Sequence, residues 1–480
     1  MRGAVEAAAA PAYGLAVLEA LEAAGHEAWF VGGWVRDALR GVAAHDVDVC
    51  TSARWQDSER ALVAAGMTVH ETGVDHGTVT AVVDGRPVEV TTYRVDGAYT
   101  DRRHPDSVTF VSDVREDLAR RDFTVNAMAW HPVRGLVDPF GGREDLTRGV
   151  IRAVGEPPVR FGEDALRVLR AVRFACRLGF AIEPATQGAL VSAAPELAEV
   201  ASERVGSELR GILGSGRASW ALSHETDVMV AAIPELRALV GLDQRSVWHS
   251  YDVLEHTARV MAGVECLSGG VASERLRWAA LLHDIGKPAC FTVDENGQGH
   301  FYGHPDVGAD MAERILRRLA IPSELARPVV ALVRYHDRPM RANAPSELDV
   351  ISRLDRASGL RTTGEVVALM HEMLDLRRAD ALAKAPCCRS YAVELDEHER
   401  VLRALARDHA CWRVADLAVS GSDVMAALGV SAGPAVGRAL RDALAAVMAG
   451  DIANEREGLL AWLRSRGLPP GLLQARRFCR

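Results

Sequence analysis

The sequence is poor in the features that mark secreted, membrane-spanning or nucleic-acid-coating proteins. Only eight of its 480 residues are cysteine, without repeating spacing, which favours reduced thiols over disulfides or cysteine-bound zinc. No apolar run reaches the ~20 residues that a bilayer-spanning helix needs, and the N-terminus carries Glu6, Glu19 and Glu22 rather than the basic residues of a secretory signal. The formal net charge of −9 excludes a general nucleic-acid coat but leaves room for a local basic groove. We therefore expect a cytoplasmic protein with no membrane partner.

The distribution of β-type runs predicts an α+β fold. At 480 residues and 48% hydrophobic, the chain is long enough for two to four domains with cores of their own. The expected strands are 28–31, 46–50, 78–83 and 87–93. The expected helices are 11–26, 34–40, 55–65, 163–178, 185–199, 203–213 and 219–230. Periodicity thus places a small mixed sheet in an N-terminal domain, followed by all-α parts. The expected domains are 1–150, 151–245, 246–390 and 391–480.

A glycine pair and two aspartates lie close together near the start of the chain. Gly32 and Gly33 form a turn before a short helix, and their free N–H groups suit a triphosphate. Asp46 and Asp48 are one residue apart on an apolar run, so alternation in a strand directs both to one face. Two such carboxylates repel each other unless a cation lies between them, and Mg²⁺ prefers oxygen ligands. The stretch therefore predicts nucleotidyl transfer.

A third carboxylate, Glu89, lies on the second arm of a predicted hairpin. Asp84-Gly85 between two β-rich runs is typical of its turn. Together with the two aspartates, Glu89 could hold two Mg²⁺ ions about 4 Å apart. From its position alone, an exposed strand glutamate with no role at the site is the favoured interpretation.

Two further segments combine cations with groups that bind sugar or base. Arg121, Asp122 and Asn126 lie within six residues, where arginine grips phosphate oxygens and the other two can bind ribose hydroxyls. Asp164 and Arg167 are three residues apart at the expected start of a helix, so they share a face. They could read the edge of a base, or they could form an intrahelical salt bridge.

The same helix continues with an arginine stripe at positions 170, 173 and 177. These residues, Arg170, Arg173 and Arg177, are either a phosphate track for RNA or a salt-bridged surface. In an acidic protein we favour the track.

The order of these motifs resembles the class II nucleotidyltransferases of the polymerase β superfamily, and within it the bacterial tRNA CCA-adding enzymes and their poly(A) polymerase relatives. The resemblance covers roughly residues 25–215. It is carried by seven motifs in order, GG-x-VRD, D-x-D-x-x-T, EVTTYR, RRDFT-x-NA, DPFGG-x-x-DL, EDALR and SERVGSEL. It implies a nucleotidyltransferase head, a helical neck and body, and a tail.

The resemblance also implies residue roles and an activity. The metal carboxylates correspond to Asp46, Asp48 and Glu89. The nucleotide-binding positions correspond to Gly32, Gly33, Arg36, Asp37, Arg121, Asp122 and Asn126. Asp164 and Arg167 correspond to the pair that reads the incoming base, and Glu203 and Arg204 to a motif that supports the nucleotide-selecting helix. The implied reaction is template-free addition of CMP and AMP, from CTP and ATP with Mg²⁺, to a tRNA 3′ end.

A second constellation follows in the helical part of the chain. Histidines and aspartates recur in the order H…HD…H…H…D, at His256, His283, Asp284, His304, His336 and Asp380. This order resembles the HD superfamily of metal-dependent phosphohydrolases, with Lys287 placed to meet a phosphate. Imidazole and carboxylate ligands admit Mn²⁺, Ni²⁺ or Fe²⁺ as well as Mg²⁺. The resemblance implies phosphodiesterase or phosphatase activity, whereas a structural role is the alternative for any single histidine.

Three functions remain open at this point. The first is a CCA-adding enzyme with an appended HD domain. The second is a poly(A) polymerase, or an enzyme that adds only part of CCA. The third is an HD phosphohydrolase acting on RNA 3′ ends, with a remnant head. The intact carboxylates and EDALR disfavour the third, and RRDFTVNAMAW lacks an aromatic pair expected of proteobacterial poly(A) polymerases.

Overall fold

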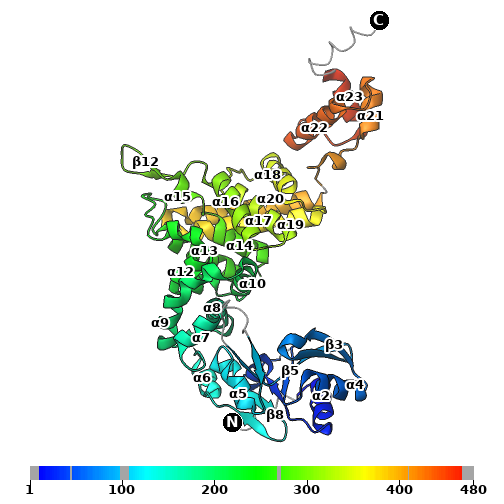
Figure 1. The fold of residues 1–480 in the computed structure, drawn as a ribbon. Helices are drawn as coiled ribbons and strands as arrows, with labels where there is room; N and C mark the ends of the chain where they lie inside the picture. Colours follow the sequence, from blue (N-terminus) through cyan, green and yellow to red (C-terminus); the bar gives the residue numbers. More distant parts are fainter. Residues whose placement is uncertain (1–9, 44–45, 98–106, 268–271, 409, 467–480) are drawn as a thin grey trace. The chain divides into compact units, whose positions relative to one another are not determined.

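The computed structural model describes residues 10–43, 46–97, 107–267, 272–408 and 410–466, and it divides the chain into two compact units. The first unit spans Met1–Pro234 and the second Glu235–Arg480. Sheet and helix occur together in the first, and helices dominate the second (Figure 1), which confirms the α+β prediction. The seven cysteines in the described part of the chain are free, as expected, while Cys479 lies outside it. No helix among the described residues is long and apolar enough to cross a bilayer.

A seven-stranded mixed sheet organises the first unit. Its order is β3-β4-β5-β2-β1-β8-β9, with β2 and β5 parallel and the other neighbours antiparallel. The strands are β1 (Ala28–Val31), β2 (Asp48–Thr51), β3 (Thr68–Gly73), β4 (Thr78–Val83), β5 (Arg86–Thr92), β8 (Ala129–His131) and β9 (Gly135–Val137). The turn at Asp84 and Gly85, both with positive φ, forms the predicted hairpin between β4 and β5. Strands β3, β8 and β9 were not expected from the sequence.

Side-chain alternation gives the sheet two different faces. Helices α2 (Ala12–Ala23) and α4 (Trp55–Ala64) contribute Leu18 and Leu62 to a core with Phe30 and Val49 on one face. Asp48 has the opposite parity to Val49, so its carboxylate lies on the other face. The apolar alternation that buries β2 therefore also directs the carboxylate away from this core.

Two sequence expectations about element bounds are corrected here. The strand expected at 46–50 begins only at Asp48, because its partner strand β1 ends at Val31, the residue paired with Asp48. The helix expected at 219–230 is two helices, α11 (Ala218–His224) and α12 (Thr226–Ala232), separated by Glu225 with non-helical φ −116° and ψ 36°.

The helices of the first unit that carry or support the residues of the candidate site lie both between its strands and after them in the chain. They are α3 (Gly33–Leu39), α5 (Val114–Ala119), α6 (Gly142–Arg148), α7 (Pro157–Glu163), α8 (Leu166–Leu178), α9 (Pro184–Ala193) and α10 (Ser202–Leu213). Helices α8 and α10 pack together, with Leu169 and Leu209 fully buried. The packing of these two helices holds the polar side chains described below in place.

The second unit is built from helices. They are α13 (Val253–Leu267), α14 (Glu274–Leu282), α15 (Lys287–Cys290), α16 (His304–Arg318), α17 (Ser323–Tyr335), α18 (Ala344–Ser358), α19 (Thr363–Ala383), α20 (Arg389–Arg407), α21 (Gly421–Leu428), α22 (Pro434–Ala449) and α23 (Arg456–Arg466). Helix α13 packs against α19, and α14 against α17. The last three helices share a small apolar core of their own, which includes Val424, Ala443 and Leu459.

Candidate functional site

Three carboxylates lie at one end of the parallel strand pair in the first unit. Asp48 opens β2 and is paired in register with Glu89 on β5, so both side chains project from the same face, and Asp46 precedes the strand by two residues. Burial, then the charge of Glu89 and that of Asp46, raises the pKa of Asp48 to about 6, against the opposing charge of Arg121. Such crowding of carboxylates is relieved by a bound cation, and oxygen ligands of this kind fit a divalent ion.

The Gly32 turn brings the backbone close to these carboxylates. Gly32 has φ 69° and ψ −134°, a conformation that side-chain-bearing residues rarely adopt. A Cβ at this position would lie 3.2 Å from Nη1 of Arg121 and 3.5 Å from Oδ2 of Asp48. The positive φ, together with the close approach of Arg121 and Asp48, thus explains why Gly32 directly precedes helix α3.

A buried hydrogen-bond network connects α3 to α8. Arg36 donates from Nε and Nη2 to Asp37, at 2.9 and 2.7 Å, and from Nη1 to Oδ1 of Asn126 at 2.8 Å. Asn126 donates to Oδ1 of Asp122 at 3.2 Å, while Arg170 donates twice to its Oδ2, at 2.9 and 2.6 Å. Burial alone would raise the pKa of Asp122, but Arg170 outweighs it, so this pKa is lowered and the carboxylate stays charged.

Arg121 lies between the carboxylates and the interior of the site. Its Nη2 donates to Asp117 at 3.4 Å, and its buried Nε has no hydrogen-bond partner in the described part of the chain. Asp117 is itself buried and accepts from Arg120 at 2.8 Å. A buried guanidinium with an unused donor is suited to an anionic ligand.

Asp164 and Arg167, which the sequence predicts to read the base, lie at a break between two helices, which corrects the single helix expected at 163–178. Helix α7 ends at Glu163 and α8 begins at Leu166, while Asp164 between them is extended, with φ −145° and ψ 105°. The break arises because Oδ1 of Asp164 accepts from the N–H of Leu166 at 3.0 Å, capping the new helix.

Asp164 and Arg167 each pair with another residue. Oδ2 of Asp164 accepts from Arg204 on α10 at 2.9 Å. Arg167 forms an ion pair with Glu163 and donates to the carbonyl of Arg120 at 3.2 Å. The intrahelical salt bridge considered from the sequence is therefore replaced by contacts that hold both side chains in place. Glu203, the neighbour of Arg204, is exposed.

The arginine stripe on α8 is largely salt-bridged. Arg173 donates to Glu208 on α10 at 2.6 Å, and Arg170 also lies 3.9 Å from this carboxylate, while Arg177 is exposed. Sequence reasoning missed Glu208, although it lies in the SERVGSEL motif on the buried side of a helix. Its role is to position two arginines rather than to meet a ligand.

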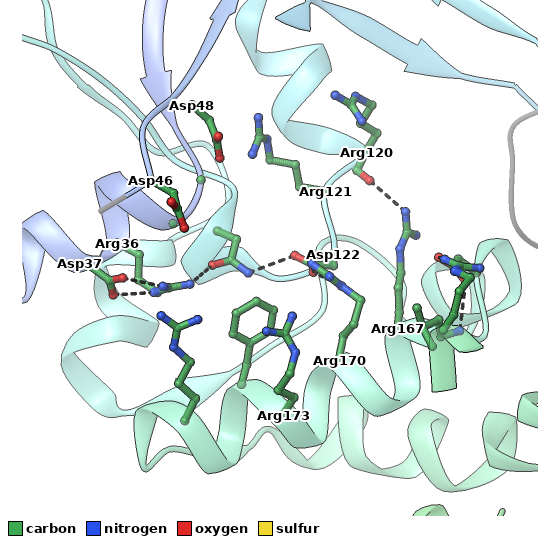
Figure 2. Close-up of a pocket in the computed structure, with 18 of the residues that line it drawn as sticks. Arg36, Asp37, Asp46, Asp48, Arg120, Arg121, Asp122, Arg167, Arg170 and Arg173 are labelled. Carbon is green, nitrogen blue, oxygen red and sulfur yellow. Dashed lines mark hydrogen bonds and ion pairs between the residues drawn. The ribbon is translucent and has the colours of Figure 1, made fainter. Parts of the chain in front are cut away.

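Most of these side chains line one cavity of about 540 Å³; the exceptions are Glu89, Asp117, Glu163, Glu203 and Glu208. Figure 2 shows Asp46 and Asp48 on one side of it, with Arg170 and Arg173 rising from α8 opposite them. Eight arginines and five aspartates line the cavity, so it is positively charged within an acidic chain. Its size suits a nucleotide.

The second unit brings the H…HD…H…H…D residues together as two adjoining triads. One triad is His256, His283 and Asp380, and the other is Asp284, His304 and His336. Within each, the candidate ligand atoms lie within 4.8 Å of one another. Nε2 of His256 lies 3.1 Å from Asp380 and 3.4 Å from Asp284, which connects the triads.

Hydrogen bonds orient the histidines of both triads toward the cluster. Nδ1 of His283, His304 and His336 contacts the carbonyl three residues earlier, at 2.9, 2.9 and 2.8 Å. This leaves Nε2 of each ring facing the other ligands, an arrangement typical of metal-binding histidines. Nε2 of His256, Nε2 of His283 and Oδ2 of Asp284 are buried, and among the described residues they form close ion-pair contacts but no hydrogen bond of good geometry. The donor set therefore fits divalent metal ions.

The wall of this cluster holds further polar groups. Lys287 forms an ion pair with Asp284 and donates a hydrogen bond to Gln244, both at 2.7 Å, and Lys384 pairs with Asp380. Burial, followed by the charges of Lys287 and Lys384, lowers the pKa of His249 to about 3, so its ring is neutral. Sequence reasoning missed Gln244, His249 and Lys384, which lack a spacing that separates them from ordinary polar residues.

Three family models match this chain. The model of the Poly A polymerase head domain matches residues 28–152, that of the probable RNA and SrmB- binding site of polymerase A matches 179–239, and that of the HD domain matches 249–385. The match to the HD domain agrees with the resemblance stated from its metal-ligand order.

Curated relatives and solved structures extend the match over nearly the whole chain. The CCA-adding enzyme of Geobacillus stearothermophilus is 34% identical over 94% of this chain and 96% of its own length. That of Leuconostoc mesenteroides is 49% identical over 43% of this chain and 50% of its own.

The crystal structure of the Bacillus stearothermophilus CCA-adding enzyme in complex with CTP is 32% identical, with a TM-score of 0.70 over 97% of this chain and 98% of its own. A Thermotoga maritima enzyme complexed with tRNA shares the fold at 20% identity and a TM-score of 0.56, over 95% and 94% of the two chains. Sequence and structure agree over both units, and the chain belongs to the CCA-adding enzyme family.

Proposed function

We propose that this chain is a tRNA nucleotidyltransferase that adds C, C and A to tRNA 3′ ends from CTP and ATP, without a nucleic-acid template. One observation carries the proposal. Asp46 and Asp48 line the same cavity as the Asp164–Arg204 pair, so nucleotidyl transfer and base selection can act on the same nucleotide.

The side chains of the site have different roles in this proposed reaction. Asp46, Asp48 and Glu89 would hold Mg²⁺, which when bound offsets the charge of the triphosphate and of the attacking hydroxyl. Arg121, with its unused Nε donor, binds phosphate oxygens.

Asn126, tied to Arg36 and Asp122, is placed to orient the ribose. Asp164 and Arg167 present acceptors and donors to the base. Each addition joins the 3′ oxygen of the tRNA to the α-phosphorus of the nucleotide and releases pyrophosphate.

The test uses three tRNA transcripts that end before CCA, after C and after CC. Purified protein receives each with Mg²⁺ and CTP, ATP or both, and products are resolved to single nucleotides. We expect CMP addition to the first two substrates and one AMP on the third, with no reaction in EDTA. Long ATP-dependent tails would indicate a poly(A) polymerase instead, and a stop at CC or a requirement for preformed CC would indicate a partial enzyme.

We propose a second activity for the metal-ligand cluster in the second unit, namely metal-dependent hydrolysis at RNA ends: one water opens a 2′,3′-cyclic phosphate to a phosphomonoester, and one water releases phosphate from a 3′-phosphorylated end. The supporting observation is the pair of adjoining triads of ligand atoms formed by His256, His283 and Asp380 and by Asp284, His304 and His336. Since a nucleotidyltransferase needs a free 3′ hydroxyl, such an activity would prepare its substrate.

Phosphate release is assayed with Mg²⁺, Mn²⁺ and Ni²⁺ in turn, on wild type and on His283→Ala. We expect release by the wild type alone. A wild type that releases no phosphate with any of these metals contradicts the second activity.

A further inference from the structure

The segment 246–249 forms part of the wall of the cavity beside the metal-ligand cluster in the second unit, and it is hydrogen-bonded to the residues that follow α19. The N–H of Ala385 donates to the carbonyl of Trp248 at 2.9 Å, and Sγ of Cys388 approaches the same oxygen at 3.7 Å. Val247 and Trp248 are 73% and 52% exposed. His249 instead lies edge-on to His256, with ring centroids 5.6 Å apart. Adjacent residues thus present an aromatic ring to solvent and an imidazole to the cluster.

His249 has hydrogen-bonding capacity that this structure does not use. Both its ring nitrogens are shielded from solvent, and neither has a partner in the described part of the chain. Buried polar groups without a partner are costly and rare in native proteins. Among the other shielded, unpartnered nitrogens around this cavity, those of His256 and His283 have a metal ion as the expected partner, and Nε of Arg377 belongs to a guanidinium whose Nη atoms are already hydrogen-bonded. His249 therefore requires a partner that arrives with the bound state.

Charge balance identifies that partner as an anion. Asp284 and Asp380 are the two acidic members of the six-residue ligand set, and Lys287 and Lys384 already neutralise them. Asp337, Arg338 and Arg377 also line the cavity and together carry no net negative charge, so two divalent ions would leave an excess of positive charge there. Such an excess is stable only when an anion enters with the metals. His249 lies beside the same two lysines, whose charges act on its ring.

The neighbouring tryptophan specifies what the anion is attached to. Trp248 lines the same cavity as His249, Lys287 and Lys384, and the cavity has a volume of about 840 Å³. An exposed indole beside a cationic groove is a typical platform for a nucleobase, because every base can stack on it. The volume is sufficient for a nucleoside with one phosphate. A free inorganic phosphate would leave this platform unused.

We propose that Trp248 and His249 recognise the terminal nucleotide of a 3′-phosphorylated RNA end, with His249 hydrogen-bonded to the phosphoryl group and Trp248 stacked on the base. The proposal rests on the second activity above and names the residues that recognise its substrate. His249 acts as a binding and positioning residue, so no bond to it is made or broken.

The test measures binding separately from hydrolysis. The full chain is loaded with Mn²⁺, its metal content is determined by mass spectrometry, and a hydrolysis-resistant 3′-methylenephosphonate analogue of adenosine 3′-monophosphate (called the nucleotide below) and inorganic phosphate are titrated calorimetrically. We expect His249→Asn to weaken both ligands about tenfold, the loss typical of a hydrogen bond to a charged group. Trp248→Ala should weaken the nucleotide about tenfold and leave phosphate unchanged. Val247→Ala, on the same exposed segment, is the matched control and should change neither.

The outcomes separate this proposal from the second activity. Unchanged phosphate affinity in His249→Asn, or a lower metal content in that variant, overturns the role of His249. Equal wild-type affinities for nucleotide and phosphate overturn the role of Trp248. Where His249→Asn fails to fold by circular dichroism, His249→Gln takes its place. A wild type that binds the nucleotide but releases no phosphate supports the binding site and contradicts hydrolysis, whereas a wild type that binds neither ligand overturns the proposal.

Discussion

Asp48 combines more constraints than any other side chain of the nucleotide cavity. It opens a strand, faces Glu89 across the ladder, approaches Gly32 and has a raised pKa. These features arise because Asp48 lies at the start of a strand, on the face opposite the apolar core, beside Glu89 and the Gly32 turn. The residue is therefore sensitive to both metal and proton.

We predict that Asp46→Ala or Asp48→Ala reduces nucleotide addition at least a hundredfold while the protein stays folded. Removing a metal carboxylate deletes positioning and charge compensation, which is worth on the order of several kcal/mol. Turnover is measured on tRNA ending in CC with ATP, and folding by circular dichroism. A variant retaining more than a tenth of wild-type turnover would show that the metal carboxylates have been misassigned.

The raised pKa of Asp48 predicts a pH-dependent effect on stability. A carboxyl group with a folded-state pKa near 6, against an ordinary 3.8, makes the folded protein bind more protons between these values. Without metal, stability therefore falls as pH rises through this window. Asp48→Asn removes that penalty, so we expect the variant to gain up to about 2–3 kcal/mol at pH 7.5.

The measurement is urea unfolding of both proteins in EDTA at pH 5, 6 and 7.5. The difference between them should widen with pH. Saturating Mg²⁺ should cancel it, because the metal compensates the wild-type charge. A difference that does not vary with pH would contradict the assigned cause.

Individual residues differ in how far the sequence alone reveals them. Asp46 and Asp48 are visible because strand alternation puts them on one face. Glu89 is ambiguous until the parallel pairing of β2 and β5 puts it in register with Asp48. His249 could not have been found, because its distinguishing feature is two unpartnered nitrogens in a folded environment. Local patterns carry the first kind of information and only tertiary pairing carries the others.

At the scale of elements, α8 and α10 form the support of the nucleotide cavity. Their contact is polar at one edge, where Glu208 holds Arg173 and approaches Arg170, and apolar elsewhere. The edge determines where the arginines point. A change there should affect binding through position rather than through charge at the ligand.

We predict that Glu208→Ala destabilises the protein by roughly 2–3 kcal/mol, below the range of a fully buried pair because Arg173 is partly exposed. It should also raise KM for both CTP and ATP several-fold. Glu203→Ala is the control, since Glu203 is exposed on the same helix. Equal behaviour of the two variants in urea unfolding and steady-state kinetics would argue against a supporting role of Glu208.

The joint between α7 and α8 predicts a different phenotype. Arg204→Ala releases Asp164 from its ion pair, so the choice among CTP, ATP, GTP and UTP should degrade by about tenfold, more than triphosphate binding does. Competition assays with all four nucleotides on tRNA ending in CC measure this. A uniform loss for every nucleotide would indicate that the pair is only structural.

Element prediction from the sequence succeeded where the pattern is local. Helices α2, α3, α4 and α10 and the β4–β5 hairpin are confirmed within a few residues. The break at Asp164 was missed, because a capping aspartate inside a helical pattern is recognised only when its side chain turns back to Leu166. Short strands such as β8 and β9 have too few residues to show alternation.

At the scale of the whole molecule, the two candidate sites belong to different compact units. The nucleotide cavity is formed within Met1–Pro234 and the metal-ligand cluster within Glu235–Arg480. The four-domain division expected from the sequence remains a prediction. The division into two units is sufficient to make the activities separable.

We predict that His283→Ala leaves the rate of CMP and AMP addition within twofold of wild type while removing phosphate release from 3′-phosphorylated RNA. The reason is that no residue lining the nucleotide cavity contacts His283 among the described contacts. Both reactions are run on the same preparation. A parallel loss of both would show that the cluster supports the first unit.

The arginine-lined cavity within an acidic chain affects which RNAs stay bound to the protein and for how long. Attraction to phosphates is concentrated where eight arginines gather, while the protein as a whole repels polyanions. RNAs that do not fit the cavity therefore meet little that retains them. A completed tRNA likewise leaves once it no longer fits the cavity, since no general charge holds it back. The uneven charge thus favours frequent sampling and rapid release, as an enzyme that must inspect every tRNA requires.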